Sequence, residues 1–347
     1  MLAVLALASL ACKKDDDETE IFYLDGSLKF DIPEFLVPEQ VITMVPRGVT
    51  HPDKEEIGYY WKVTPTMTTF DTTKFLTGPN VDGVVYDGSF THKFSDTLQT
   101  YTVYCYAFAD GYSSSSTSNY TTVVSAKLDG SITGTGIKAD DPSIKVNGND
   151  IYYTTIGQLD WFRQNLAFTE SGVPFRNGEP MDGVFGRYYS YEDAIKACPE
   201  GWRLPTCEDW DKLGKALLGE TGKEASHLYE SIPGIASKLM ADTYFNGYKM
   251  WEYWPSVGRP TNESCLSFIP TGYANLGEKT STGAYPYAKF HGVYEYAVFW
   301  TADKDADGMA YYRYIYCDRP DLQIGKGDTN NFGAAVRCVR GESSNIQ

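Results

Sequence analysis

The sequence predicts two successive domains, an all-β sandwich followed by an α+β domain. The chain has 347 residues, and 42% of them are hydrophobic, which is sufficient for a packed core. That length is enough for about two domains of ~150 residues each. Short strand patterns separated by turns run through residues 21–128, whereas helical spacings of apolar residues occur only after residue 150. The change of periodicity indicates where the second domain begins.

The formal net charge of −16 argues against several classes of partner. Nucleic acids and anionic membrane surfaces attract clustered Lys and Arg, so no nucleic acid is expected to bind this chain. Aromatic residues make up 15% of the chain, and 27 of its residues are Tyr. Frequent Tyr is explained first by β-structure, with a recognition surface as the alternative.

The first twenty residues predict export and a lipid anchor. Residues 1–11 form an apolar run that fits a signal peptide, and it is far shorter than the ~20 residues of a membrane-spanning helix. The run ends in a segment that resembles the bacterial lipobox, and Cys12 is therefore the expected lipid attachment site. Ser9 departs from the usual Leu, and the absence of a basic segment leaves room for a start codon upstream. The charged tether at 12–20 resembles the acidic export signals of Bacteroidetes surface lipoproteins.

Residues 21–128 predict an immunoglobulin-like β-sandwich. Alternate residues from Tyr101 to Ala107 fall on one face of a strand, which places Cys105 inside as a small hydrophobic thiol. Trp61 lies in the third strand pattern, where such sandwiches bury an aromatic ring. The strands resemble PKD-like and other bacterial immunoglobulin-like modules. They are SLKFDI, VITMVP, IGYYWKV, GVVYDGSF, TYTVYCYAFADGY and NYTTVVSAKL.

Residues 129–149 are rich in Gly, Thr, Asp and Ser and are expected to form a linker. Gly134-Thr135-Gly136 is a fragment of a phosphate-loop pattern, but no helix with the right spacing follows it, so nucleotide binding is rejected.

The second domain begins with strands and then shows three helical patterns. Ser190 is the expected N-cap of the first, and one buried stripe is expected to contain Tyr191, Ala194, Ile195 and Cys198. Thr206 and Asp209 predict a capping box at the start of the second helix, directly after the turn in CPEGWRLPT. A third helical stretch is expected at 234–241.

Several ordered motifs carry a family resemblance. They are WFRQNL, GRYYSYEDAIKACPEGWRLPTCEDWDKL, TNESCLSFIPTGY, FWTAD, MAYYRY and AAVRCVR. They resemble the Fibrobacter succinogenes major paralogous domain, which occurs in exported proteins of Bacteroidetes and Fibrobacteres, and the resemblance covers residues 150–342. It implies a fold related to C-type lectin-like domains and to formylglycine-generating enzymes. The resemblance to this family implies no particular catalytic reaction.

The resemblance also constrains the cysteines. In the C-type lectin-like plan, a cysteine near the first helix pairs with one in the last strand, which implies a Cys198–Cys338 disulfide. That bond would close a loop of about 140 residues and contribute roughly 3–5 kcal/mol. A second disulfide, Cys265–Cys317, is the further expectation, and Cys207 is left without a partner.

Motifs for metal or enzyme chemistry are sparse. Asp303, Asp305 and Asp307 have the spacing of a calcium loop, but position 12 is Tyr314 instead of Glu, so an acidic hairpin turn is favoured over calcium. The Glu-Pro-Asn, Gln-Pro-Asp and Trp-Asn-Asp motifs of calcium-dependent lectins are absent. The four His residues are scattered, which gives no basis for a zinc site or a catalytic triad. No cofactor is therefore expected.

The stretch YKMWEYWP is the candidate ligand site of the sequence. It contains Tyr248, Trp251, Tyr253 and Trp254 and lies where lectin-like folds carry variable ligand loops. The rings could stack on a ligand or cover the core of a loop-rich domain, and both interpretations remain open.

These observations predict a non-enzymatic lipoprotein of the outer membrane, exposed at the cell surface and touching the membrane only through its lipid. Its head would recognise a glycan or a protein, as an adhesin does. The alternatives are a carbohydrate-active or modifying enzyme with unassigned carboxylates and a structural envelope protein without a ligand.

Overall fold

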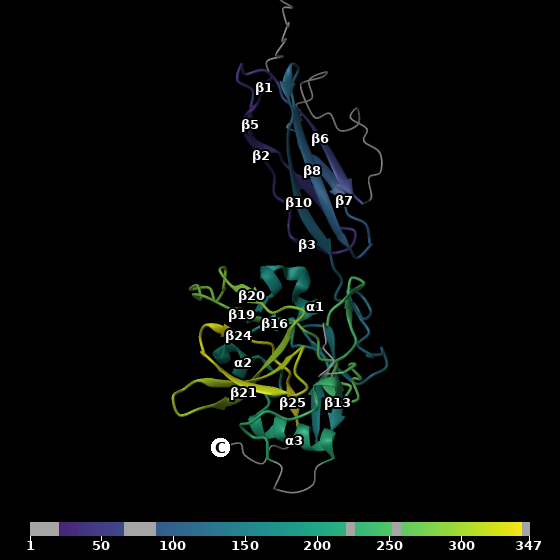
Figure 1. The fold of residues 1–347 in the computed structure, drawn as a ribbon, viewed down its shortest axis with the longest axis vertical. Helices are drawn as coiled ribbons and strands as arrows, with labels where there is room; N and C mark the ends of the chain where they lie inside the picture. The colour runs from purple at the N-terminus through teal and green to yellow at the C-terminus, as the bar shows by residue number, and fades with distance from the viewer. Residues whose placement is uncertain (1–20, 66–87, 220–225, 252–257, 342–347) are drawn as a thin grey trace, which may run out of the picture. The chain divides into compact units, whose positions relative to one another are not determined.

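A computed structural model of the chain describes residues 21–65, 88–219, 226–251 and 258–341 (Figure 1). This part of the chain is mostly β-strand with few helices. It divides into two compact units. Among the described residues, one unit comprises 21–31, 43–65, 88–91 and 102–119. The other comprises 32–42, 92–101, 120–219, 226–251 and 258–341. None of the helices in the described ranges has the length and hydropathy of a membrane span.

The first unit is built on the antiparallel pairing of β6 (Gly58–Thr64) with β8 (Thr100–Phe108), which sets Trp61 opposite Cys105. Both residues are buried, as the period-two pattern predicts. Burial raises the pKa of the Cys105 thiol to about 12, so this thiol stays protonated and unreactive. Four further strands lie wholly in this unit: β1 (Phe22–Tyr23), β2 (Asp25–Lys29), β5 (Arg47–Thr50) and β9 (Tyr112–Ser113). The unit also includes most of β10 (Ser115–Val123) and parts of β4 (Val41–Met44) and β7 (Phe90–Lys93).

The second unit contains several small sheets. One has the strand order β12-β13-β14-β25, with β12 (Ser143–Val146), β13 (Asn149–Ile156), β14 (Leu159–Phe162) and β25 (Val339–Arg340). Another has the order β21-β22-β23, with β21 (Tyr296–Lys304), β22 (Ala310–Tyr316) and β23 (Gln323–Gly327). A third has the order β20-β19-β24, with β20 (Lys289–His291), β19 (Tyr273–Asn275) and β24 (Phe332–Gly333). The pair β15–β16 joins Val173–Pro174 to Arg187–Tyr188.

The hairpin of β21 and β22 is packed on both faces. On one face, Phe299 belongs to a buried cluster that includes Trp210 and Leu213. On the other face, Trp300 belongs to a cluster that includes Tyr191. Successive residues of a strand point to opposite faces, so the hairpin separates the two halves of the core.

The two predicted helix starts are confirmed. Ser190 caps α2 (Tyr191–Ala197) by accepting a hydrogen bond from the backbone N–H of Asp193. Thr206 caps α3 (Cys207–Leu218), and Asp209 completes the capping box. The predicted stripe on α2 is wrong at Ile195, which is 43% exposed, because the core meets only the side of this short helix that carries Tyr191 and Ala194.

The remaining helices are short. The third predicted helix is a single turn, α4 (Ala236–Leu239), since the backbone is already extended at Met240. α1 (Asp182–Phe185) also has one turn and follows two short 3-10 helices, Phe175–Asn177 and Glu179–Met181.

Part of the segment expected as a linker is built into the second unit. β11 (Ile132–Thr133) pairs with β17 (Tyr244–Phe245), which in turn pairs with β18 (Tyr248–Lys249). β12 pairs with β13 through four residues, from Ser143 opposite Tyr152 to Val146 opposite Asn149. Backbone hydrogen bonding thus orders stretches that composition alone assigns to a flexible connection.

Candidate functional site

The aromatic residues predicted to bind a ligand do not form a common surface. Trp251 is 1% exposed, and its indole Nε1 donates to the carbonyl oxygen of Phe268 at 3.0 Å. Tyr248, in contrast, is 75% exposed. Tyr253 and Trp254 lie outside the described residues. The prediction is therefore wrong for Trp251, which the core needs as an apolar filler with one satisfied donor.

The acidic loop spaced like a calcium site uses its carboxylates within the fold. Asp303 Oδ2 accepts from the backbone N–H of Cys207 at 2.6 Å, at the start of α3. Asp305 accepts from the backbone N–H groups of Asp307 and Met309, and it pairs with Lys326 at 2.7 Å. This arrangement matches the acidic turn of the prediction. Within the described ranges, no three His, Cys, Asp or Glu side chains group closely enough to hold a metal ion.

The structure contains the Cys198–Cys338 disulfide, with the two Cα atoms 5.8 Å apart. The predicted second bond is wrong, because Cys265 and Cys317 both keep their thiols. Cys317 is packed in the buried cluster around α3, whereas Cys265 lies on an exposed loop. Cys12, the expected lipid attachment site, precedes the described residues.

The segment CPEGWRLPT is a structural joint. Trp202 is 8% exposed and its ring lies 4.4 Å from that of Phe162. Arg203 makes two hydrogen bonds to the fully buried carboxylate of Asp209, at 2.5 and 3.0 Å. A bidentate pair of this kind fixes direction as well as distance. The joint therefore orients α3 against the sheets. Trp202 and Arg203 are engaged in packing and in hydrogen bonds within the fold.

Aromatic side chains gather instead on one face of the β21–β22–β23 sheet. The register sets Tyr296 opposite Tyr316, Val298 opposite Tyr314 and Trp300 opposite Tyr312. Tyr273 from β19 and Phe332 from β24 extend the same surface. We call the group Tyr273, Tyr296, Tyr312, Tyr314, Tyr316 and Phe332 the tyrosine trough. It lines a cavity of about 780 Å³, within the size range of small-ligand sites.

The rings of the trough hold one another in place. Tyr296 and Tyr316 are stacked with their centroids 4.6 Å apart and their planes at 15°. Tyr312 stacks on Phe332 with the ring centroids 4.7 Å apart, and Tyr273 also stacks on Phe332, at 5.6 Å. Each ring is half-buried, so one part packs and the other part faces solvent. Such a surface is rigid before any ligand arrives, which lowers the entropic cost of binding.

A glycine makes room for one of these rings. Gly325 lies opposite Tyr312, and a Cβ atom at this position would come within 2.4 Å of the ring. The absence of a side chain on β23 therefore lets the Tyr312 ring lie across the strand. The sequence IGKG gives no sign of this role, since it depends on the pairing between β22 and β23.

The hydroxyl groups of the trough are available to a ligand. Within the described chain, none of the five tyrosine hydroxyls has a hydrogen-bond partner. Burial raises the pKa of Tyr296 and of Tyr312 above the ordinary value, and the charge of Asp318 does the same for Tyr316. The hydroxyls of Tyr296, Tyr312 and Tyr316 thus stay protonated at neutral pH. A tyrosine hydroxyl can both donate and accept a hydrogen bond.

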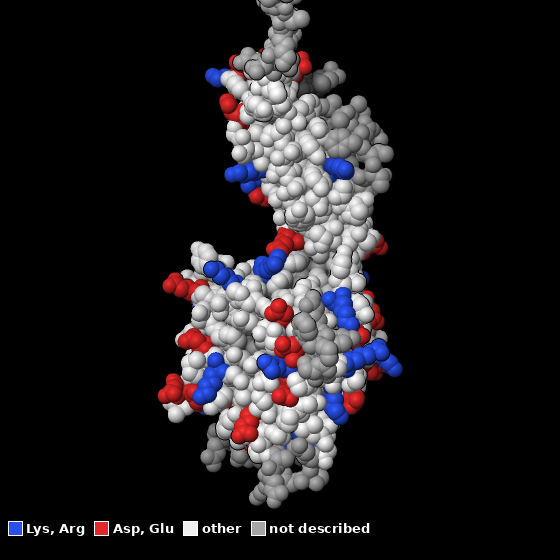
Figure 2. Space-filling view, viewed as in Figure 1, with Lys and Arg blue, Asp and Glu red and all other residues white. Residues whose placement is uncertain are grey.

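Polar side chains border the same cavity. Gln323 lies opposite Tyr314 and is held by Ser231, whose hydroxyl donates to Oε1 at 3.0 Å. Asp321 accepts from the backbone N–H of Gly234 at 3.0 Å. Arg319 is exposed, with Nε 3.7 Å from the carboxylate of Asp318. Figure 2 shows acidic and basic side chains interspersed over the visible face, with no extended basic patch among the described residues there.

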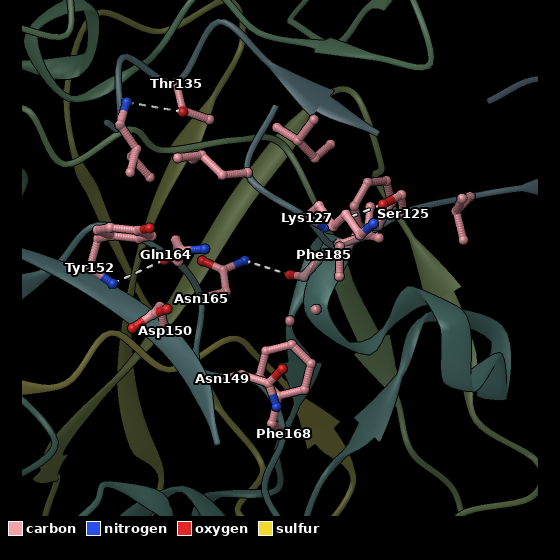
Figure 3. A pocket seen from close by; sticks show the side chains of 18 of the residues that line it. Ser125, Lys127, Thr135, Asn149, Asp150, Tyr152, Gln164, Asn165, Phe168 and Phe185 are labelled. Atoms are coloured by element: carbon pink, nitrogen blue, oxygen red, sulfur yellow. Dashed lines mark hydrogen bonds between the residues drawn. The ribbon is translucent and has the colours of Figure 1, made fainter. Parts of the chain in front are cut away.

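A second cavity, of about 770 Å³, lies elsewhere in the same unit (Figure 3). In that view Tyr152, Gln164 and Asn165 lie on one side of it, and Ser125, Lys127 and Phe185 on the other. Asn165 is 4% exposed and donates to the carbonyl oxygen of Phe185 at 2.9 Å. We call this space the Arg337 cavity, after the buried arginine that also lines it.

The tyrosine trough is the candidate site that the sequence pattern did not predict. Tyr312, Tyr314 and Tyr316 occur at every second position, which does place them on one face of a strand. Their pairing with Tyr296 and their approach to Tyr273 and Phe332 depend on strand register and on segments far apart in the chain. No local signal contains that information.

Comparison with known proteins identifies the family but not a function. A superoxide reductase (neelaredoxin) from Ignicoccus hospitalis is 13% identical, with a TM-score of 0.22, over 28% of this chain and 80% of that chain. The adhesin InvE of Yersinia pseudotuberculosis is 9% identical, with a TM-score of 0.21, over 90% of this chain and 70% of that chain. Both TM-scores are too low to support an inference. No curated protein matches the chain.

The family model of the Fibrobacter succinogenes major domain matches residues 154–340. These residues include the Cys198–Cys338 disulfide and the capped helices α2 and α3. They also include the sheets β21-β22-β23 and β20-β19-β24, which carry the tyrosine trough. The match covers more than half of the chain, and the protein therefore belongs to the Fibrobacter succinogenes major domain family.

Proposed function

We propose that the protein is a surface lipoprotein without enzymatic activity that recognises a glycan through the tyrosine trough. In this proposal Cys12 carries the lipid, residues 21–128 form an immunoglobulin-like stalk, and residues 150–342 form a C-type lectin-like head. A protein ligand is the alternative occupant of the same surface.

The observation that carries the proposal is the set of five tyrosine hydroxyls without partners, among the described residues, on rings that are already packed together. Rigid aromatic faces offer a large contact area at low entropic cost, and each hydroxyl offers a donor and an acceptor. A glycan combines apolar ring faces with many hydroxyl groups, so it matches both properties. Gln323 and Asp321 add an amide and a carboxylate at the border.

The test is a parallel screen of the purified full chain against a glycan array and an array of extracellular host proteins. Tyr314→Ala and Tyr316→Ala should reduce binding at least about tenfold, as the loss of an aromatic anchor does. Tyr287→Ala is the matched control, since this tyrosine is 76% exposed and lies outside the trough. Tyr314→Phe, which removes only the hydroxyl, separates hydrogen bonding from stacking.

Three outcomes are informative. Glycan binding that the Tyr314 and Tyr316 variants lose, and that the Tyr287 variant keeps, supports the proposal. Binding confined to the protein array, with the same dependence on the trough, replaces the glycan by a protein ligand. Binding to neither array, or binding that the trough variants leave intact, overturns the proposal. Circular dichroism of each variant confirms that the fold is retained.

A further inference from the structure

The Arg337 cavity combines a buried positive charge with unused hydrogen-bond donors. Arg337 is 1% exposed, its hydrogen bonds all go to neutral oxygens, and its guanidinium lies over the rings of Phe268 and Phe299, 4.9 and 5.5 Å from their centroids. Nε donates to Asn165 Oδ1 at 2.8 Å, and the terminal nitrogens donate to the carbonyl oxygens of Phe162, Leu266 and Ser267 at 3.1, 2.7 and 3.4 Å. Within the described part of the chain, no carboxylate pairs with it.

The neighbouring cation does not remove this charge. Arg163, 5% exposed, is paired with the carboxylate of Asp141, so that pair is close to neutral. Burial lowers the pKa of Arg337, and the nearby Arg163 lowers it further, in keeping with the lack of a paired carboxylate in the described part of the chain. An uncompensated buried cation is costly, and an anion beside it would offset that cost.

Two further donors line the same space. Tyr152 is 8% exposed, and its hydroxyl has no partner among the described residues. The side-chain oxygen of Gln164 accepts from the backbone N–H of Tyr152 at 3.0 Å, which leaves its NH₂ group as a donor with no partner in the same residues. Figure 3 places both side chains on one wall of the cavity.

The negative groups of the cavity are at its exposed parts. Asp129, Asp150 and Glu179 are all exposed, and Asp150 is bound to Lys145 at 2.8 Å. Apolar side chains, among them Ile137, Phe168 and Ile269, complete the lining. The interior thus offers donors, the unpaired cation of Arg337 and apolar surface, since Arg163 is already paired with Asp141. At the exposed parts three acids outnumber the one cation, Lys127, which disfavours ligands with several negative charges.

We propose that the Arg337 cavity binds a small organic carboxylate, a molecule with one carboxylate group and an apolar body. The carboxylate would lie near Arg337 and accept hydrogen bonds from Tyr152 and Gln164, and the body would contact the apolar walls. This second site does not depend on the tyrosine trough.

The test compares acids with their uncharged amides on the full chain. Benzoate and phenylacetate are titrated by calorimetry and by saturation-transfer NMR, with benzamide and phenylacetamide as matched probes of the same shape. An acid should bind at least about tenfold more tightly than its amide, because a charge-assisted hydrogen bond is much the stronger kind. The comparison probes the charge without altering Arg337, whose replacement would disturb the fold.

Two variants locate the site. Tyr152→Phe should weaken acid binding by about three- to tenfold, the effect of losing one hydrogen bond. Tyr153→Phe, on the adjacent residue of β13, and Tyr314→Ala, in the trough, should leave acid binding unchanged. Equal affinity for acid and amide, binding of neither acid, or equal binding by the Tyr152 and Tyr153 variants would each overturn the proposal.

Discussion

Cys198, directly after the last residue of α2, is bonded to Cys338, which directly precedes β25, across a separation of 140 residues. The bond joins the start of the helical region to the end of the domain. The double variant Cys198→Ala/Cys338→Ala should lower the free energy of unfolding by roughly 3–5 kcal/mol, because the unfolded chain regains the freedom of the open loop. Denaturant titration of both proteins measures the difference.

The matched control is Cys207→Ala, which removes a buried thiol without opening a loop. Addition of a reductant should destabilise the wild type and the Cys207 variant, and it should leave the double variant unchanged. Wild-type stability that does not respond to a reductant able to open the bond would contradict the prediction.

Variants of Arg203 and Asp209 should show how much the joint between α2 and α3 contributes to the free energy of unfolding. Arg203→Lys keeps the charge but loses the bidentate geometry, and it should cost about 1–2 kcal/mol of unfolding free energy. Asp209→Ala should cost more, roughly 3–5 kcal/mol, because it removes both the buried partner of Arg203 and the N3 half of the capping box of α3. Arg319→Lys, at an exposed position, is the control and should be neutral. Equal stability of the two arginine variants would show that the joint does not need the fork geometry.

Gly325→Ala should impair the trough. The added Cβ would lie 2.4 Å from the Tyr312 ring, so the ring must move and its stacking on Phe332 is disturbed. Ligand affinity should fall at least about fivefold, with a loss of stability of about 1–3 kcal/mol from overpacking. Lys326→Ala, at the next and exposed position of β23, is expected to keep ligand affinity. Unchanged binding by Gly325→Ala would remove Tyr312 from the proposed site.

Alanine variants of Trp251 and Tyr248 should differ in stability, because the first residue is buried in the core and the second is exposed. Trp251→Ala is expected to cost about 3–5 kcal/mol, because it leaves a cavity in the cluster around α3. Tyr248→Ala, at a 75% exposed position, should change stability by no more than ~0.5 kcal/mol. Thermal and denaturant unfolding measure both. A neutral Trp251→Ala would contradict its placement in the core.

Protonation of Asp193 should lower the free energy of unfolding in acid. Burial would raise the pKa of this carboxyl, but hydrogen bonds from Lys279 and Ser190 outweigh burial and hold the pKa below its ordinary value of 3.8. The ionised group therefore stabilises the fold above about pH 3.8, and this contribution is lost as the pH falls through the lower folded-state pKa.

Asp193→Asn should accordingly be less stable than the wild type by about 1 kcal/mol at neutral pH, and the difference should shrink in acid. Unfolding titrations between neutral pH and pH ~3 follow the convergence. Asp307→Asn, at an exposed turn, serves as the control variant and should be as stable as the wild type at neutral pH. A constant difference across this range would show that the carboxylate charge is not what stabilises the helix start.

Local features of the fold were readable in the sequence wherever neighbouring residues determine them. The caps at Ser190 and Thr206 depend on residues only three positions apart. The burial of Cys105 follows from the alternation along a single strand. The disulfide of Cys198 with Cys338 came from a family resemblance, because spacing alone does not select one pairing among six cysteines.

Features that depend on the packing of distant segments could not be predicted from the pattern of neighbouring residues. Trp251 and Tyr248 are three residues apart in one aromatic stretch, yet one fills the core and the other faces solvent. The Cys265–Cys317 pairing failed for the same reason, since exposure and burial of the two thiols are decided by the elements packed around them.

The sequence by itself determined the β-rich character, the helix starts and the family of this protein, because period, capping and motif order are local properties of the chain. Only the tertiary structure decided where its two candidate sites lie. Tyr296 meets Tyr316 through strand register, and Arg337 meets Asn165 across 172 residues of chain. The physical reason is that a binding surface consists of side chains whose proximity is created by folding.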